Sequence, residues 1–510
     1  MAPHFAKDIP SHLLMWQRVR EYAVPPSMIE TATARRAAGD WAGACAAARI
    51  DVDLDLRAVR ESHGTELVTR LRADLRRLAP DLLRWHMPRI APDGRLRPGL
   101  TLSLARYRGS GATPVQLVVR TPPARADAGQ RMSLTLWEGA GNDTARHHPH
   151  PHPDRRFRLD LHRHLWDFGH SGELAARCGA HLAHTAGGAL PTVPPDLSPQ
   201  RTGPPGPPGV SQASAGHDSP WAVARWAAEA ELLLRAEGRP RGAFTVRLDA
   251  RRRAVLELLA PDDSHVPMLR PLRQALPPQE VAALPVLPEA AARVLPDLEL
   301  LRGGLIATGR LHPLVAAALA ACGSAMRSGS APVAGPAPAP GDPHRVECRG
   351  EVHRIALRDG VLTAVDHDPA QLRREELLAA LGGPPLPCLR AIDAVHRDPE
   401  ALPAVRERLR HGDVTGALAV VEGLLGPGAV LRDGPLREEL ESAAARRIDH
   451  GLFRSGLVAV HPAAGAVGDG DTSDTGYAKA GHRPRPGRHT PFELHRKRSS
   501  RARPRTGMGR

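Results

Sequence analysis

Apolar residues near the N-terminus follow the period of an amphipathic helix. In Leu13–Tyr22, Ser27–Ala38 and Glu66–Trp85 they recur every three or four residues, so one face of each segment would be apolar. Ser27 and Glu30 have the spacing of a capping box, which predicts Ser27 as the N-cap of the second helix.

Beyond these helices the apolar period changes to two. Alternating apolar and polar residues, separated by turn residues, are typical of antiparallel strands with one buried face. The first three such segments predict a β-meander. Asp359-Gly360, near the end of the chain, predicts a tight hairpin turn. The strand candidates are 100–107, 115–121 and 131–137, then 243–249 and 254–260, and finally 345–349, 351–357 and 361–365.

Small sheets combined with helices predict an α+β fold. Two stretches rich in Pro and Gly cannot pack a core and are typical of linkers. They divide the chain into three ordered blocks followed by a tail. The expected parts are a helical segment with the meander (1–186), a linker (187–220), an α+β block (221–325), a second linker (326–343), a block of β-hairpin and helices (344–460), and a disordered basic tail (461–510).

One short motif occurs twice, as AGDWAGACAAA at 38–48 and as HGDVTGALAVV at 411–421. In both copies the Gly stands where a helix ends and the Asp where the next helix begins. Gly43 and Gly416 would each cost about 1 kcal/mol relative to Ala inside a helix, which predicts a neighbouring backbone packed against them. The motif therefore predicts two helical hairpins with structural caps at Gly39, Asp40, Gly412 and Asp413.

A run of histidines is the most conspicuous group of possible ligands. Imidazole binds zinc, nickel or copper, but this run is interrupted by prolines and follows a predicted strand, so a loop is expected. A structural site usually needs four ligands fixed by their surroundings, and we therefore expect only weak metal affinity. The candidate ligands are His147, His148, His150 and His152.

Other motifs are incomplete. The triplet Asp51, Asp53 and Asp55 resembles half of a calcium loop, but Leu56 and Ser62 stand where that loop needs Gly and Glu. Cysteines are odd in number and lack CxxC spacing, which argues against disulfides and against a cysteine zinc site. They are Cys45, Cys178, Cys322, Cys348 and Cys388.

Nucleophile and phosphate motifs are also missing. Ser171, in GHSGE, lacks the G-x-S-x-G pattern of a nucleophile elbow. GPGAVL, at 426–431, lacks the third glycine of a dinucleotide fingerprint, and no Walker A pattern occurs. The sequence therefore predicts no catalytic residue and no cofactor.

The net charge of +14 belongs mainly to the C-terminus. In Gly481–Arg510, ten Lys and Arg residues stand against one acid, Glu493. Such a segment is expected to be disordered, and it could bind phosphates by releasing counterions. A nucleic-acid arm, an inert terminus and a frameshifted extension all remain open.

The N-terminal residues lack the charged and apolar regions of a secretory signal. The longest apolar run, Leu314–Cys322, is far shorter than a membrane span. We therefore expect a cytoplasmic protein that makes no use of a membrane.

Three stretches resemble uncharacterised proteins of high-GC actinobacteria: VPPSMIETATARRAAGDWAGACAAARIDVDLDL, RRLAPDLLRWHMPRI and RLRHGDVTGALAVVEGLLGPGAVLRDGPLREELE. The resemblance covers most of Val24–Leu457 and implies no known activity. The last stretch also resembles a single ankyrin-like helical hairpin, although Arg437 replaces the turn histidine. One copy cannot form an array, since about three stacked units are needed to bury a repeat core.

Together these patterns favour a non-catalytic protein that acts through contacts with an unidentified protein partner. Two alternatives remain open: an enzyme of an unrecognised class, and nucleic-acid binding through the tail alone. An enzyme would have a deep pocket with convergent polar groups and shifted pKa values.

Overall fold

We describe the protein from a computed structural model of its 510 residues. The chain divides into two compact units, Met1–Arg447 and Ile448–Arg510. All sites discussed below belong to the first. The structure describes residues 9–107, 114–127, 129–139, 152–178, 220–249, 252–259, 267–272, 276–321, 345–397, 401–426 and 428–455.

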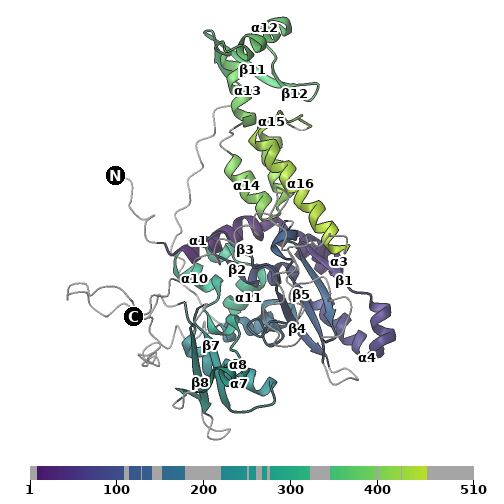
Figure 1. Ribbon diagram of the computed structural model, residues 1–510, viewed down its shortest axis with the longest axis vertical. Coiled ribbons are helices and arrows are strands. Elements are labelled where there is room, and N and C mark those ends of the chain that lie inside the picture. The colour runs from purple at the N-terminus through teal and green to yellow at the C-terminus, as the bar shows by residue number, and fades with distance from the viewer. Residues whose placement is uncertain are drawn as a thin grey trace, which may run out of the picture. The chain divides into compact units, whose positions relative to one another are not determined.

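Helices dominate the N-terminal part of the first block (Figure 1). The helical period of the sequence is confirmed here, but the predicted cap at Ser27 is wrong. The second helix begins one residue earlier, at Pro26, and no side chain caps it. Proline suits this position because it lacks an N–H and its φ is already helical. The helices are α1 (Ser11–Arg18), the π-helix η2 (Val19–Ala23), α2 (Pro26–Ala37), α3 (Trp41–Ala47), α4 (Leu56–Arg77) and α5 (Pro80–His86).

The predicted meander forms three strands of a four-stranded sheet. The fourth strand, β1 (Ile50–Asp53), pairs in parallel with β6 (Met132–Trp137), giving the order β1-β6-β5-β4. The aspartates that imitate half a calcium loop therefore lie in or beside a strand. β5 (Val115–Arg120) lies next to β6 in the middle of the sheet, and β4 (Thr101–Tyr107) forms the edge opposite β1.

Short elements complete the first block. They are the hairpin β2 (Arg89–Ile90) and β3 (Arg95–Leu96), the 3₁₀ turns η3 (Ala124–Ala126), η5 (Leu159–Leu161), η6 (Arg163–Leu165) and η7 (Phe168–Glu173), and the helix α6 (Leu174–Arg177).

The second block holds a three-stranded antiparallel sheet of order β7-β8-β9, whose third strand the sequence pattern did not predict. Trp226 and Phe244 are buried between this sheet and α7. The elements are η11 (Val223–Arg225), α7 (Trp226–Ala236), β7 (Gly242–Arg247), β8 (Arg253–Leu259), β9 (Met268–Pro271), α8 (Pro278–Ala283), α9 (Glu289–Ala292), α10 (Pro296–Arg302), η12 (Thr308–Arg310) and α11 (Pro313–Ala321).

The largest core joins residues of two sequence blocks. Leu298 of α10 and Val315 of α11 are buried in the same cluster as Leu71 of α4 and Leu102 of β4. Trp85 Nε1 donates a hydrogen bond to Asp297, 2.8 Å away. The end of the second block therefore packs into the core of the first.

The third block combines a small antiparallel sheet with five helices of the described chain. The predicted turn at Asp359-Gly360 is present, with positive φ at both residues, and Asp368 caps α12 through the amide of Ala370. The elements are β10 (Arg345–Cys348), β11 (Glu351–Arg358), β12 (Val361–Ala364), α12 (Pro369–Ala380), α13 (Pro387–Arg397), α14 (Leu402–Arg410), α15 (Val414–Leu425) and α16 (Pro435–Arg454). The whole is an α+β fold, as the sequence predicts.

Within the described ranges, every helix is too short or too polar to cross a bilayer.

Candidate functional site

A cavity of about 440 Å³ lies among α1, the segment after α5, the start of η5 and the segment that leads into α10. Its volume is within the range of small-molecule sites. Apolar side chains form part of the wall. Among them are Met15, Trp16, Met87, Leu102, Phe157 and Leu295.

The charged part of the wall is rich in arginine. Six arginines line the cavity, against three carboxylates, at Asp249, Glu289 and Glu299. Arg156 and Arg158 are held by ion pairs to Asp154 and Asp160 beside the cavity. The arginines are Arg89, Arg97, Arg156, Arg158, Arg247 and Arg293.

Arg97 and Arg293 differ from the other lining arginines. Within the described chain, neither guanidinium forms an ion pair or a hydrogen bond. Those of Arg89 and Arg247 donate to backbone carbonyls. By contrast, the guanidinium of Arg97 lies 5.9 Å from the ring centre of Phe157, and that of Arg293 lies 4.7 Å from the ring of Trp221. A guanidinium stacked on a ring keeps its edge N–H groups available as donors. These two side chains can therefore receive an anion.

Glu299, on α10, lies in the same wall. Burial raises its pKa to about 7, against the lowering effects of Arg293 and Arg302. Its Oε1 lies 3.5 Å from His12 Nε2, and burial, aided by Arg293, lowers the pKa of His12. Near neutral pH the cavity therefore contains a carboxyl group that can gain or lose a proton.

His86 connects the cavity wall to the core. Its Nε2 lies 3.4 Å from Asp297 Oδ2, the oxygen that also accepts the indole N–H of Trp85. Burial opposes ionisation of Asp297, but His86 and Trp85 together hold the pKa of this carboxyl below its ordinary value. This group of buried side chains fixes α5 against α10.

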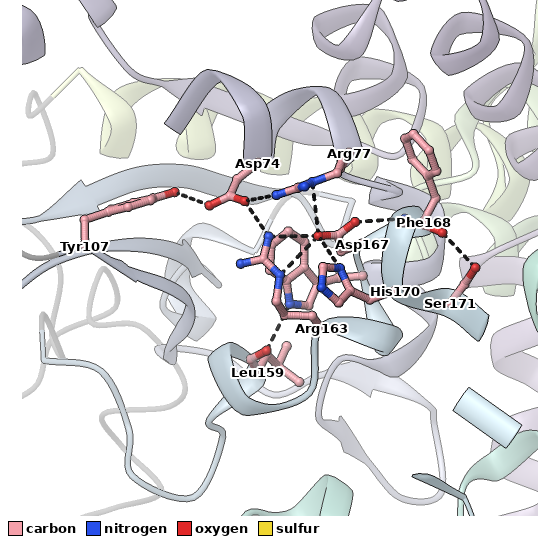
Figure 2. A network of polar contacts seen from close by, with 11 residues as sticks. Asp74, Arg77, Tyr107, Leu159, Arg163, Asp167, Phe168, His170 and Ser171 are labelled. Atoms are coloured by element: carbon pink, nitrogen blue, oxygen red, sulfur yellow. Dashed lines mark hydrogen bonds and ion pairs between the residues drawn. The ribbon is translucent and has the colours of Figure 1, made fainter. Parts of the chain in front are cut away.

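A second polar network lies where the end of α4 meets β4 and the 3₁₀ turns η6 and η7 (Figure 2). Tyr107 donates a hydrogen bond to Asp74 Oδ2 over 2.8 Å, and Arg77 donates to Asp74 Oδ1 over 2.9 Å. Arg163 bridges Asp74 and Asp167. Two carboxylates and two guanidinium groups thus neutralise one another, which is typical of a structural network.

Ser171 lies at the edge of this network but is no nucleophile in it. Its hydroxyl donates to the carbonyl of Phe168 over 2.8 Å, while His170 Nδ1 lies 3.0 Å from Asp167 (Figure 2). The serine and the histidine have separate partners, so no Ser-His pair forms here.

The predicted helix caps lie where the motif places them. Asp40 accepts a hydrogen bond from the amide of Gly43, and Asp413 from that of Gly416. The expectation that a neighbouring backbone explains these two glycines is wrong. A Cβ at either position would come within 2.1 Å of the capping carboxylate itself. Gly43 and Gly416 therefore leave room for the capping carboxylates. The glycine directly before each capping aspartate has a positive φ, +77° at Gly39 and +80° at Gly412.

Only one of the four predicted histidine ligands lies within the described residues. His147, His148 and His150 lie outside the described residues, and His152 is exposed, with its ring 6.0 Å from that of Trp137. Metal binding by these histidines stays a prediction.

A different group of metal-ligating side chains does converge. Cys348, His367 and Cys388 each place one ligand atom within 4.8 Å of the others. Both cysteines are buried and free of disulfide bonds. Sequence reasoning missed this group because 18 and 20 residues separate its members.

The cavity also escaped sequence reasoning, although one stretch could have indicated it. LRWHMPR, at 83–89, gathers Trp, His and Arg in a chain whose aromatic content is 3%. Four of its residues line the cavity, from His86 to Arg89. The available signal is this unusual concentration of large polar and aromatic residues at the end of a buried helix.

The chain matches no protein-family model, and neither the curated proteins nor the solved structures contain a significant match to it.

Proposed function

We propose that the cavity binds a small organic anion. The observation that carries this proposal is the pair Arg97 and Arg293, which line one cavity and form no ion pair within the described chain. Carboxylates and phosphates are the groups that guanidinium binds best, because its N–H donors match two oxygens at once.

The apolar part of the cavity wall indicates what the uncharged part of the ligand would be. Met15, Trp16 and Phe157 offer apolar and aromatic surface, which would bury a hydrocarbon or ring system next to the charged group. A cavity of about 440 Å³ suits a metabolite-sized molecule. We therefore propose an amphipathic ligand with one anionic group.

Glu299 would make binding depend on pH. With its pKa at about 7, the carboxyl is mostly neutral below neutral pH and mostly negative above it. A negative Glu299 repels an anion in the same cavity. Affinity is therefore expected to fall as the pH rises from 6 to 8.

Isothermal titration of the full chain tests this proposal. The probes are a panel of aromatic and aliphatic carboxylates and phosphate monoesters, each compared with its neutral amide or alcohol. We expect an anion in the panel to bind and its neutral counterpart not to bind. Arg97→Gln and Arg293→Gln should each weaken binding about tenfold or more, as expected for a charge-assisted contact.

The matched control is Arg60→Gln, which removes the same charge from an exposed position on α4. Equal affinities for charged and neutral probes would contradict the proposal. So would an Arg97→Gln effect no larger than that of the control.

A second candidate function is docking of a protein partner, as the sequence patterns favour. Three leucines of the α12 segment support it: Leu377, Leu378 and Leu381 are 65%, 50% and 87% exposed. Exposed apolar side chains that are close together are typical of interaction surfaces. Replacing all three with serine should abolish capture of a partner, and capture that survives unchanged would contradict this role for α12.

Nucleic-acid binding through Gly481–Arg510 also stays a prediction, because this tail lies outside the described residues. Removal of the tail should then abolish salt-dependent binding to DNA or RNA.

A further inference from the structure

Three elements of the third block bring metal-ligating side chains to one place. Cys348 is the last residue of β10, just before the hairpin turn at Arg349-Gly350. His367 follows β12, and Cys388 lies in the first turn of α13. The hairpin, the loop and the helix thus each contribute one ligand atom to the same group.

The two cysteines lie in an apolar environment, whereas His367 is partly buried. Both cysteines belong to a small buried cluster with Ala364, Leu372 and Leu389. No disulfide joins the two cysteines. A pair of reduced thiols enclosed by aliphatic side chains, with an imidazole beside them, forms a donor set of two sulfurs and one nitrogen.

A second observation concerns the histidines near the two thiols. Nε2 of His367 and Nδ1 of His353 are both buried and lack a hydrogen-bond partner. The two rings stack with their centres 4.2 Å apart. Buried polar atoms are usually satisfied, so an unsatisfied nitrogen on the imidazole that lies beside two thiols calls for an explanation.

We propose that Cys348, His367 and Cys388 bind a zinc ion. Thiolate and imidazole are the ligands that zinc prefers in proteins, and three of them can hold the ion with the fourth position left for water. The ring of His353 stacks on that of His367 and packs beside the site. The site is separate from the anion cavity and does not depend on it.

The ion would link three elements that lie far apart along the chain. Both thiols lose their protons to solvent when they bind, so one zinc ion replaces two protons and affinity rises with pH. The cluster that surrounds the site holds only six buried residues. A bound metal therefore stabilises a part of the fold that has little apolar core of its own.

The test uses the full chain, reduced and free of added metal, in which His147, His148, His150 and His152 are replaced with alanine. This background excludes the histidine run as a source of metal affinity. Cobalt titration monitored by absorbance measures the stoichiometry and also reports thiolate ligands by their charge-transfer band. Competition with zinc then measures relative affinity.

We expect one cobalt ion per chain, a thiolate charge-transfer band and displacement of cobalt by zinc. Cys348→Ser, Cys388→Ser and His367→Ala should each abolish stoichiometric binding. Cys45→Ser is the matched control, because it removes another buried free thiol and should leave binding unchanged.

Alkylation of the unsubstituted protein provides a measurement that does not depend on folding of the variants. With zinc bound, Cys348 and Cys388 should resist alkylation until a chelator is added. No stoichiometric metal, a spectrum without thiolate ligands, or a disulfide between the two cysteines in the freshly purified chain would each overturn the proposal.

Discussion

Burial changes the ionisation of individual side chains in this protein. Glu299 is partly buried without a direct ion pair to arginine, and its pKa rises to about 7. His411 shows the opposite case, since burial, together with Arg89 and Arg84, lowers its pKa to about 3. Arg84 itself is fully buried and donates to the backbone carbonyls of Ala23 and Gln130. In each case the sequence gives the type of ionisable residue, but the surrounding structure determines its pKa.

Glu299→Gln tests this effect on stability. The native pKa of about 7 lies above the unfolded value of about 4.5, so the native state binds the proton more tightly. Stability of the natural protein therefore falls as the pH rises from 5 to 8, and glutamine removes that dependence. We expect the variant to gain roughly 2 kcal/mol relative to the natural protein between these pH values.

Urea unfolding at pH 5 and pH 8 measures the difference. Glu61→Gln is the control, because this exposed carboxylate is hydrated in both the folded and the unfolded state. If both variants show the same pH profile as the natural protein, Glu299 does not carry the expected linkage.

At the scale of elements, the repeated Gly-Asp motif makes the same turn in two different environments. Both turns have a glycine with positive φ and an aspartate that caps the next helix. A Cβ at Gly39 would meet nothing within 4 Å, whereas at Gly412 it would come within 2.0 Å of the carbonyl oxygen of Gly129. The local motif is shared, but only the second turn lies against another segment of backbone.

The pair Gly39→Ala and Gly412→Ala separates these two contributions. Gly39→Ala should cost about 1 kcal/mol, the conformational cost of alanine in the left-handed region. Gly412→Ala adds a backbone clash and should cost at least about 2 kcal/mol more. Chemical denaturation of both variants measures the difference, and equal losses of stability would show that the contact with Gly129 is absent in solution.

At the scale of the whole molecule, the core does not follow the divisions of the sequence. Leu298 and Val315 lie beyond the first predicted linker, yet they are buried with residues of the first block. The pair His312 and Asp81, 2.8 Å apart and both buried, also joins the two blocks. Residues 295–319 therefore complete the first core.

Cleavage at a protease site inserted between residues 179 and 219 tests this shared core. The two fragments should remain associated during gel filtration, because separation would expose the buried faces of α10 and α11 to water. A cleavage site inserted after residue 455 serves as the control, since it removes only the tail. Separation of the first two fragments into folded, independent species would contradict a shared core.

The sequence by itself determined the local elements of this protein. Helical and alternating periods predicted the main helices and the meander, and the caps at Asp40 and Asp413 follow from residues within a few positions of each other. These features are predictable because the side chain and the backbone group it satisfies are neighbours along the chain.

Only the tertiary structure decided which distant residues meet. The parallel pairing of β1 with β6, the arginine-lined cavity, and the group of Cys348, His367 and Cys388 all join residues far apart in sequence. No local sequence pattern predicts these long-range contacts, because they depend on how whole faces of helices and sheets pack. The two proposed binding sites therefore depend on packing, while the elements that carry them can be predicted from the order of residues.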